Sequence, residues 1–252
     1  MRQKLIAGNW KMNGLKADST HLVQEILSGL SGVSTKAEIL ICPPFTLTSL
    51  IVDQTRGTCL NVGVQDVSDA PKSSGAYTGE ISAEMGADLG ATYAIVGHSE
   101  RRSMYGETDE VVRTKAENAI KAGLTAVICV GETLQERESN RALDVVGKQV
   151  LNSVPKTANG KTVVVAYEPV WAIGTGKVPT ISDVAEMHAS IRSRLSELLG
   201  AETADSIRIL YGGSVKPSNA SELLSVENVD GALIGGASLK ADDFLAIIKT
   251  LR

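Results

Sequence analysis

The segment Thr162-Val-Val-Val-Ala-Tyr167 places five apolar residues in a row after a threonine. A strand with one solvent-facing side would alternate apolar and polar residues, so this run predicts a strand that is buried on both faces. Strands of this kind belong to parallel sheets whose two faces are covered by other elements.

Seven more apolar runs of the same character recur along the chain. They lie at residues 4–9, 38–42, 60–64, 92–96, 125–130, 207–211 and 231–234. Helical patterns separate them; Thr180 and Asp183, for example, resemble a capping box at the start of one helix. This alternation without a long linker predicts one α/β domain over residues 1–252. Eight such units in 252 residues favour a closed (β/α)8 barrel over an open doubly wound sheet.

The composition is that of an ordinary globular protein, with 43% hydrophobic and 21% charged residues. The formal net charge is -4, and the longest basic run is the pair Arg101-Arg102. Nucleic acid is therefore not an expected partner. An anionic substrate would require positive groups that are concentrated locally.

Cysteine usage and the first residues indicate the compartment. The chain has three cysteines, Cys42, Cys59 and Cys129. An odd number in a long chain argues against a disulfide framework and for a reducing compartment. The apolar run at residues 5–8 is too short for a signal-peptide core, and no apolar stretch approaches the roughly 20 residues of a membrane span. We expect a cytoplasmic protein with no membrane partner.

In a (β/α)8 barrel, functional side chains gather at the C-terminal ends of the strands. The residues in or just beyond these places are Asn9, Lys11, His98, Glu168, Gly212, Gly213, Ser214, Gly235 and Gly236. The sequence has no Gly-x-Gly-x-x-Gly after its first strand, no Walker A motif and no cluster with metal-ligand spacing. It therefore predicts neither a nucleotide cofactor nor a metal.

Glu168 is the candidate general base. A lone glutamate at a strand end is usually a solvated carboxylate, but here the apolar segment 170–173 follows almost directly. Such a segment would be unfavourable on an exposed surface and predicts a lid that closes over a ligand. Gly174 and Gly176 would supply the backbone freedom that the lid needs.

His98 is the candidate electrophile. His21 and His188 fall within helical patterns and are assigned to the structure, whereas His98 follows an apolar run at the functional end. A short helix could begin at Ser99 and Glu100. Because a helix N-terminus disfavours positive charge, we predict a neutral ring that donates a hydrogen bond.

The remaining candidates each have two interpretations. Lys11 is either a surface lysine or the cation beside a phosphate, and Asn9 either caps a turn or donates to a substrate oxygen. The glycine pairs at 212–213 and 235–236 form either tight βα turns or a phosphate cradle of backbone N–H groups that Ser214 extends. A base, a neutral electrophile, a cation and a cradle together predict proton abstraction beside a carbonyl, through an enediol-like intermediate.

Six segments spread from end to end resemble the triosephosphate isomerase family. They are Gly8-Asn-Trp-Lys-Met-Asn13, Gly75-Ala-Tyr-Thr-Gly-Glu80, Gly97-His-Ser-Glu-Arg-Arg102, Tyr167-Glu-Pro-Val-Trp-Ala-Ile-Gly-Thr-Gly176, Tyr211-Gly-Gly-Ser214 and Leu233-Ile-Gly-Gly-Ala-Ser238. The resemblance implies a TIM barrel that interconverts dihydroxyacetone phosphate and glyceraldehyde 3-phosphate in glycolysis and gluconeogenesis. It also implies a homodimer that needs no cofactor.

The resemblance carries roles to individual positions. Glu168 matches the family's catalytic base, His98 its electrophile, and Asn9 and Lys11 its substrate-contacting pair. The positions that match its phosphate-binding backbone are Gly174, Ser214, Gly235 and Gly236. Glu100 matches the family's supporting carboxylate. In the third βα loop, near residues 65–80, Thr78 would approach Asn9 and Lys11 of the other subunit.

Two positions depart from the family pattern. Pro179 stands at the end of the lid where many relatives have alanine, and proline fixes φ and removes an N–H. Asp66 stands where asparagine is common. The first is expected to alter lid opening, and the second the start of the dimer loop.

Two other functions compete with the isomerase. Another phosphosugar barrel, such as an epimerase or a synthase, would show metal ligands or additional acidic strand ends, and the sequence has neither. A non-catalytic phosphate-binding protein would be favoured if Glu168 or His98 were absent, and both are present.

Overall fold

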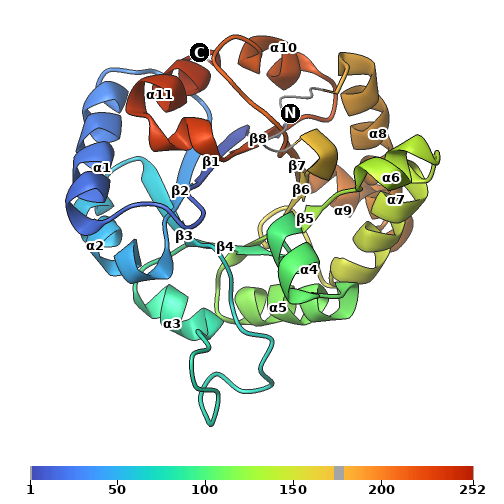
Figure 1. Cartoon of the computed structure of the whole chain (residues 1–252), viewed down its shortest axis with the longest axis horizontal. Helices are drawn as coiled ribbons and strands as arrows, with labels where there is room; N and C mark the ends of the chain where they lie inside the picture. The colour runs from blue at the N-terminus through green and yellow to red at the C-terminus, as the bar shows by residue number, and fades with distance from the viewer. Residues whose placement is uncertain (1, 173–178, 252) are drawn as a thin grey trace.

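Eight parallel strands close into a barrel in chain order, with β8 beside β1 (Figure 1). The structure is a computed structural model that describes residues 2–172 and 179–251. The strands are β1 Leu5–Asn9, β2 Glu38–Cys42, β3 Leu60–Val64, β4 Tyr93–Val96, β5 Thr125–Val130, β6 Val163–Tyr167, β7 Arg208–Tyr211 and β8 Gly231–Ile234. The predicted (β/α)8 barrel is therefore confirmed.

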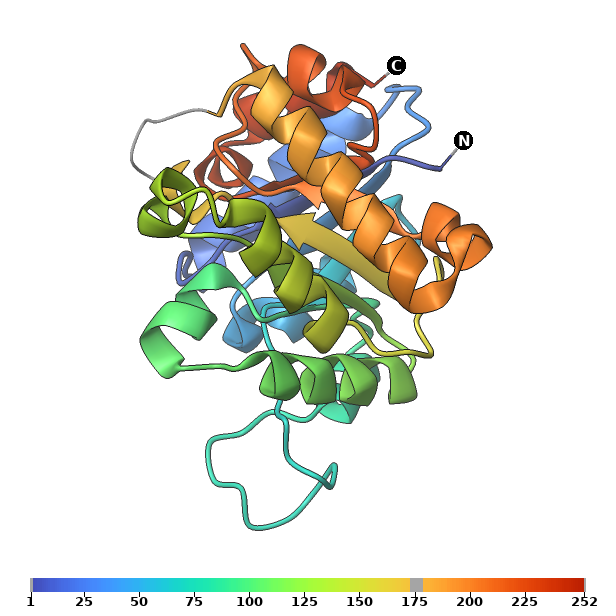
Figure 2. The ribbon, with the colours of Figure 1, turned by 90° about the vertical axis from the view of Figure 1, so that its right-hand side faces the viewer.

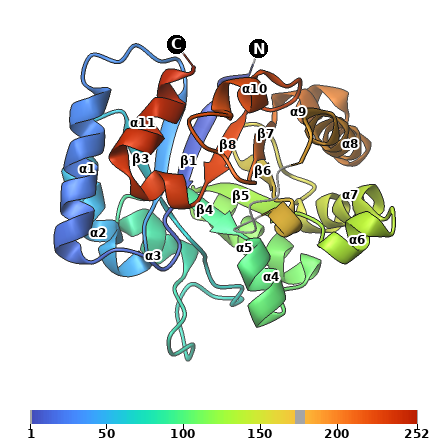
Figure 3. The same ribbon diagram turned by 45° about the horizontal axis from the view of Figure 1, so that its top comes forward.

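Helices form a ring outside the barrel (Figure 1). The α-helices are α1 Lys16–Leu30, α2 Phe45–Thr55, α3 Ala83–Asp88, α4 Ser99–Tyr105, α5 Asp109–Lys121, α6 Leu134–Glu138, α7 Ala142–Ser153, α8 Ile181–Leu199, α9 Ala201–Ser206, α10 Ala220–Ser225 and α11 Ala241–Lys249. Within the described residues two 3-10 turns accompany them, η1 Val170–Ala172 and η2 Gly236–Leu239. The first and last helices, α1 and α11, pack side by side where the ring closes (Figure 3).

The continuous apolar runs are explained by two separate hydrophobic clusters. One cluster contains only strand residues at alternating positions, such as Leu5 and Ala7 of β1 or Val164 and Ala166 of β6. The other joins the intervening strand residues to the helices. Alternate side chains therefore fill the barrel interior while the rest pack beneath the helices, and neither strand face reaches water.

The predicted elements agree closely with the observed ones. All eight predicted runs are strands, and four of them begin one residue later than predicted, at Leu5, Tyr93, Val163 and Arg208. The capping box at the start of α8 is confirmed: the side chains of Thr180 and Asp183 each accept a hydrogen bond from the backbone N–H of the other residue.

The connection between β3 and α3 projects away from the barrel as a long loop at residues 65–82 (Figures 1 and 2). Ion pairs fix the start of this loop to the rest of the protein. The Asp66 carboxylate accepts hydrogen bonds from the Lys115 ammonium at 2.8 and 2.9 Å and pairs with Arg101 at 2.8 Å. Because Lys115 is only 3% exposed, Asp66 gives this buried ammonium a charged partner that an asparagine would not.

Candidate active site

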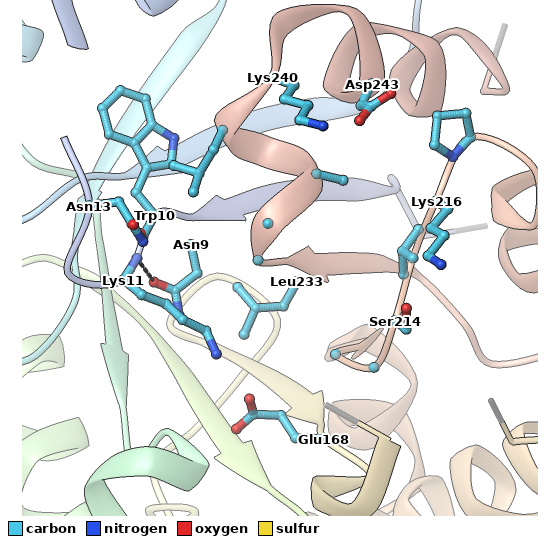
Figure 4. Close-up of a pocket in the computed structure, with 18 of the residues that line it drawn as sticks. Asn9, Trp10, Lys11, Asn13, Glu168, Ser214, Lys216, Leu233, Lys240 and Asp243 are labelled. Carbon is cyan, nitrogen blue, oxygen red and sulfur yellow. Dashed lines mark hydrogen bonds between the residues drawn. The ribbon is translucent and has the colours of Figure 1, made fainter. Parts of the chain in front are cut away.

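The ends of the strands bring the predicted residues to one mouth of the barrel. The cavity there measures about 830 Å³, and the predicted residues that line it are Asn9, Lys11, His98, Glu168, Gly212, Gly213, Ser214, Gly235 and Gly236. In Figure 4, Lys11 and Glu168 point into the same space, and Ser214 faces them from the other side. Gly174 is outside the described residues, as is the rest of the lid at 173–178.

Glu168 is buried to 98% of its surface and is held by three contacts. Its Oε1 lies 2.8 Å from His98 Nε2, its Oε2 accepts a 2.9 Å hydrogen bond from the Ser99 amide, and the Ser99 hydroxyl lies 3.4 Å from Oε1. Only 2% of the Glu168 surface is exposed, and this burial by itself would raise the pKa of the carboxyl. His98 and the Ser99 amide outweigh burial, so the net pKa lies below the usual value for glutamate.

His98 is the N-cap residue of α4. This helix begins at Ser99, where the sequence predicts a helix start at Ser99 and Glu100. Its Nδ1 accepts a 3.3 Å hydrogen bond from the Glu100 amide, which favours a neutral ring with its proton on Nε2. Burial also lowers the pKa of His98, but the carboxylates of Glu168 and Glu100 together outweigh burial and the net pKa is raised. The helix start alone therefore does not decide the charge of the ring, because a carboxylate in contact favours the protonated form.

Lys11 occupies a strained turn that several groups fix in place. Its φ is 52°, a left-handed conformation that is uncommon for a residue with a side chain. The Asn9 side chain accepts from the Lys11 amide at 3.0 Å, and Gln65 donates to the Lys11 carbonyl at 2.7 Å. The Lys11 ammonium pairs with Glu100 at 2.6 Å. Asn9 therefore does close a local turn, and Glu100 lies beside both Lys11 and His98.

The two glycine pairs differ in whether the surrounding chain leaves room for a side chain. A Cβ on Gly212 would lie 2.9 Å from Glu168 Cγ, and one on Gly213 would lie 2.2 Å from the Tyr211 hydroxyl, so packing within the chain excludes side chains there. A Cβ on Gly235 would meet only Lys11 Cε at 3.6 Å, and one on Gly236 would meet nothing within 4 Å among the described residues. The open space beside the second pair leaves room for a ligand to approach its backbone.

The start of the predicted lid is anchored to a buried carboxylate. The Oε1 of Glu132 accepts hydrogen bonds from Trp171 Nε1 at 2.8 Å and from the Tyr167 hydroxyl at 3.1 Å. Glu132 has no exposed surface, and this burial raises its pKa in spite of both bonds. At the other end, Pro179 is buried directly before the cap of α8.

The single chain does not bring Thr78 to the mouth. Thr78 is exposed on the loop at residues 65–82, which projects away from the barrel (Figure 1), and it does not line the cavity that Asn9 and Lys11 line. Two large apolar side chains beside the mouth are also exposed, Met12 at 95% and Leu15 at 75%. In the single chain, Thr78 and these two apolar side chains are therefore open to solvent.

Sequence reasoning missed several residues that hold the site. The sequence marks Ser99 only as a helix start and Gln65 only as the start of a loop, although both bond to candidate residues. Nothing in the sequence marks Gln149, yet its amide binds both backbone groups of Gly131, which lies next to Glu168. A polar residue on a helix gives no sequence signal for a contact of this kind.

Residues 2–172 and 179–251 contain no group of three or more His, Cys, Asp or Glu side chains placed to hold a metal ion. In the same part of the chain, no helix has the length and apolar character to span a bilayer.

Comparisons with known proteins agree with the fold. The sequence profile of the triosephosphate isomerase family matches residues 4–251. A triosephosphate isomerase of Xanthobacter flavus is 56% identical over 250 residues, which is 99% of this chain and 98% of that protein. One of Bradyrhizobium diazoefficiens is 55% identical over 245 residues, 97% of this chain and 96% of that protein.

The same relationship holds for solved structures. The crystal structure of triosephosphate isomerase from Bartonella henselae superposes with a TM-score of 0.90, at 48% identity and over 98% of both chains. A profile match over nearly the whole length, together with relatives above half identity, establishes that this chain is an isomerase of the triosephosphate isomerase family.

Proposed function

We propose that this isomerase interconverts dihydroxyacetone phosphate and D-glyceraldehyde 3-phosphate through an enediolate, with Glu168 as the base. One observation carries the proposal. The buried Glu168 carboxylate and the His98 imidazole lie 2.8 Å apart in a cavity that is also lined by Gly235 and Gly236, whose backbone has open space beside it. The Gly235 and Gly236 positions have no packing reason to be glycine within the described chain. Close approach of a phosphate to their N–H groups supplies that reason.

The proton moves between two carbons of the substrate by way of Glu168. The carboxylate takes a proton from C1 of dihydroxyacetone phosphate, and the electron pair of that C–H bond forms the C1–C2 double bond while the carbonyl oxygen becomes an enediolate oxygen. Return of a proton to C2, with transfer of a proton from the C1 to the C2 oxygen, gives glyceraldehyde 3-phosphate. Lys11 and the Nε2–H of His98 stabilise the oxygen on which charge develops, and Asn9 contributes to that contact.

Substrate binding must rearrange the site before this transfer. The carboxylate of Glu168 is occupied by His98 and by the Ser99 amide, and the ammonium of Lys11 by Glu100. A substrate oxygen that takes the place of Glu168 at His98 also removes the charge that raises the histidine pKa. The ring then becomes the neutral donor that the start of α4 favours.

The lid that follows Glu168 would close over the bound phosphate and exclude water. Its described part, Val170 to Ala172, is a 3-10 turn that Glu132 fixes through Trp171. Exclusion of water strengthens the electrostatic contacts of the transition state. By the family resemblance, Gly174 and Ser214 complete the phosphate site with Gly235 and Gly236.

We further infer a homodimer of single-domain chains, residues 1–252, that acts in the cytoplasm in glycolysis and gluconeogenesis without a cofactor. The exposed Met12 and Leu15 beside the mouth support the dimer, because a second subunit would cover them. The projecting loop with Thr78 is the element that would reach the partner. The resemblance to the family supplies the pathway and the compartment.

Hydrogen exchange at carbon tests the proposed reaction. The purified protein is incubated with dihydroxyacetone phosphate in D2O and followed by proton NMR. We expect glyceraldehyde 3-phosphate labelled at C2 and recovered substrate labelled at C1, and neither with Glu168→Gln, which keeps the shape of the side chain and removes the base. Absence of product and label with the wild type, or equal labelling by Glu168→Gln, would overturn the proposal.

A further inference from the structure

The backbone that carries Glu168 is held by a segment that continues past the end of β5. The last paired residues of β5 and β6 are Val130 and Tyr167. Beyond them, the Glu168 amide donates to the Val130 carbonyl at 2.8 Å, and the Val170 amide donates to the Glu132 carbonyl at 3.1 Å. Residues 130–132 therefore run alongside residues 168–170 and set their position.

Gly131 is the point of closest approach between these two segments. A Cβ on Gly131 would lie 1.8 Å from the carbonyl oxygen of Glu168. Real side chains do not tolerate that distance, so the backbones touch directly. Any displacement of Gly131 is consequently transmitted to the main chain of Glu168, with no flexible side chain between them.

A side chain from the outer ring binds both backbone groups of Gly131. The Gly131 amide donates to Gln149 Oε1 at 2.7 Å, and Gln149 Nε2 donates to the Gly131 carbonyl at 3.0 Å. A neighbouring strand would offer the same donor and acceptor, but the pairing of β5 with β4 ends at Ile128 and Val96. Gln149 is placed by α7, whose Val146 and Val150 are at most 1% exposed and fix the helix against the barrel.

A cavity of about 230 Å³ lies beside this contact and is lined by Gly131, Gln149, Glu168 and Val170, among others. The segment at residue 131 therefore has space to move into if its two hydrogen bonds are lost. On the side of this cavity, the amide of Gln149 rather than close packing holds the segment in place.

We propose that Gln149 is a positioning residue for catalysis, which holds Gly131 and through it the main chain of the base. The inference rests on the proposed function, in which Glu168 removes the proton. Among the described residues, Gln149 does not line the cavity at the barrel mouth, and its hydrogen bonds go to Gly131 rather than to Glu168. Its loss should impair the chemical step, which requires sub-ångström placement of the carboxylate. Phosphate binding should be affected far less, because only Gly174 of the proposed phosphate positions follows this segment, whereas Ser214, Gly235 and Gly236 lie on other loops.

The test compares Gln149→Met with Lys148→Met, an exposed neighbour on the same helix. For Gln149→Met we expect kcat to fall about 10-fold or more while KM and the inhibition constant of inorganic phosphate stay within about twofold. Binding of 2-phosphoglycolate, which mimics the enediolate, should weaken in parallel with kcat. Lys148→Met should match the wild type.

Gln149→Glu is a second variant that keeps an acceptor for the Gly131 amide and loses the donor to its carbonyl. It should lose part of the turnover that Gln149→Met loses, and it serves alone if the methionine variant does not fold. Unchanged kcat in both variants, or a parallel loss of kcat, phosphate affinity and thermal stability, would overturn the role of Gln149. Absence of turnover in the wild type would instead overturn the proposed function.

Discussion

Nε2 of His98 lies 2.8 Å from Oε1 of Glu168, and the two side chains are only 6% and 2% exposed. The proposed base is thus paired with the proposed electrophile in this structure. Burial of Glu168 raises its pKa, but the contacts with His98 and the Ser99 amide, together with the charge of Lys11, lower it by more. The pairing therefore keeps a buried carboxylate ionised and ready to accept a proton.

His98→Leu should move the acid limb of the kcat/KM profile to higher pH. Activity requires an ionised Glu168 and is lost as pH falls through the pKa of that carboxyl. Without His98, a contact that lowers this pKa is lost and the pKa rises, so the loss begins at a higher pH. We also expect kcat to fall about 100-fold or more, because a donor to the enediolate is lost.

The control is His21→Leu, which changes an exposed histidine on α1 and should leave the profile unchanged. An acid limb of His98→Leu that stays in place, or moves to lower pH, would contradict the role of His98 in keeping Glu168 ionised.

Lys11→Met should reduce kcat/KM by about 100-fold or more, because it removes a cation from the oxyanion that forms in the transition state. The strained turn should survive, since Asn9 and Gln65 hold it through the Lys11 backbone. Steady-state kinetics of Lys11→Met and of Lys16→Met, an exposed lysine at the start of α1, provide the check. A loss below about threefold in Lys11→Met would assign this lysine to the surface.

Lys115→Met should destabilise the protein by about 3–5 kcal/mol at neutral pH. Lys115 bonds to Asp66 at 2.8 Å and to Glu107 at 2.5 Å, and its removal leaves two largely buried carboxylates with only Arg101. The loss should shrink as pH falls, because protonated carboxyls no longer need the cation.

Urea unfolding at a fixed protein concentration measures this loss, with the exposed Lys121→Met as control. A change below about 1 kcal/mol for Lys115→Met, or a cost that grows as pH falls, would show that the network does not stabilise the base of the projecting loop.

Thr78→Arg should convert the proposed dimer to monomers. In the proposed dimer this exposed residue lies against the partner, where an unpaired guanidinium would be buried at high cost. Sedimentation at micromolar concentration should give twice the 26.5 kDa chain mass for the wild type and the single mass for the variant. Ser193→Arg, on the exposed side of α8, should remain dimeric. A monomeric wild type would refute the proposed dimer.

The barrel could be predicted from the sequence because its strands are buried on both faces. That burial produces unbroken apolar runs such as the one within residues 162–167. An amphipathic helix of similar length needs apolar residues on one face only, so its sequence would not require such a run. Strand starts were less predictable: Thr92 and Thr162 adjoin their runs but precede the observed first strand residues, Tyr93 and Val163.

The candidate residues could be found because they follow these runs, but their contacts could not. Gln65 meets Lys11 across 54 positions of sequence, and Gln149 meets Gly131 across 18. The pKa of His98 shows the same limit. Local sequence predicts a ring beside a helix start, whereas the nearby Glu168 that raises the pKa comes from a different strand.

Replacement of Glu168 by aspartate tests the central claim most directly, because it keeps the charge and withdraws the carboxylate by one methylene. In a coupled isomerase assay, the wild type should turn over dihydroxyacetone phosphate, and Glu168→Asp should lose about 100-fold or more in kcat. Its thermal unfolding midpoint should stay close to that of the wild type. Full turnover by Glu168→Asp, or no turnover by the wild type, would contradict the assignment of Glu168 as the base.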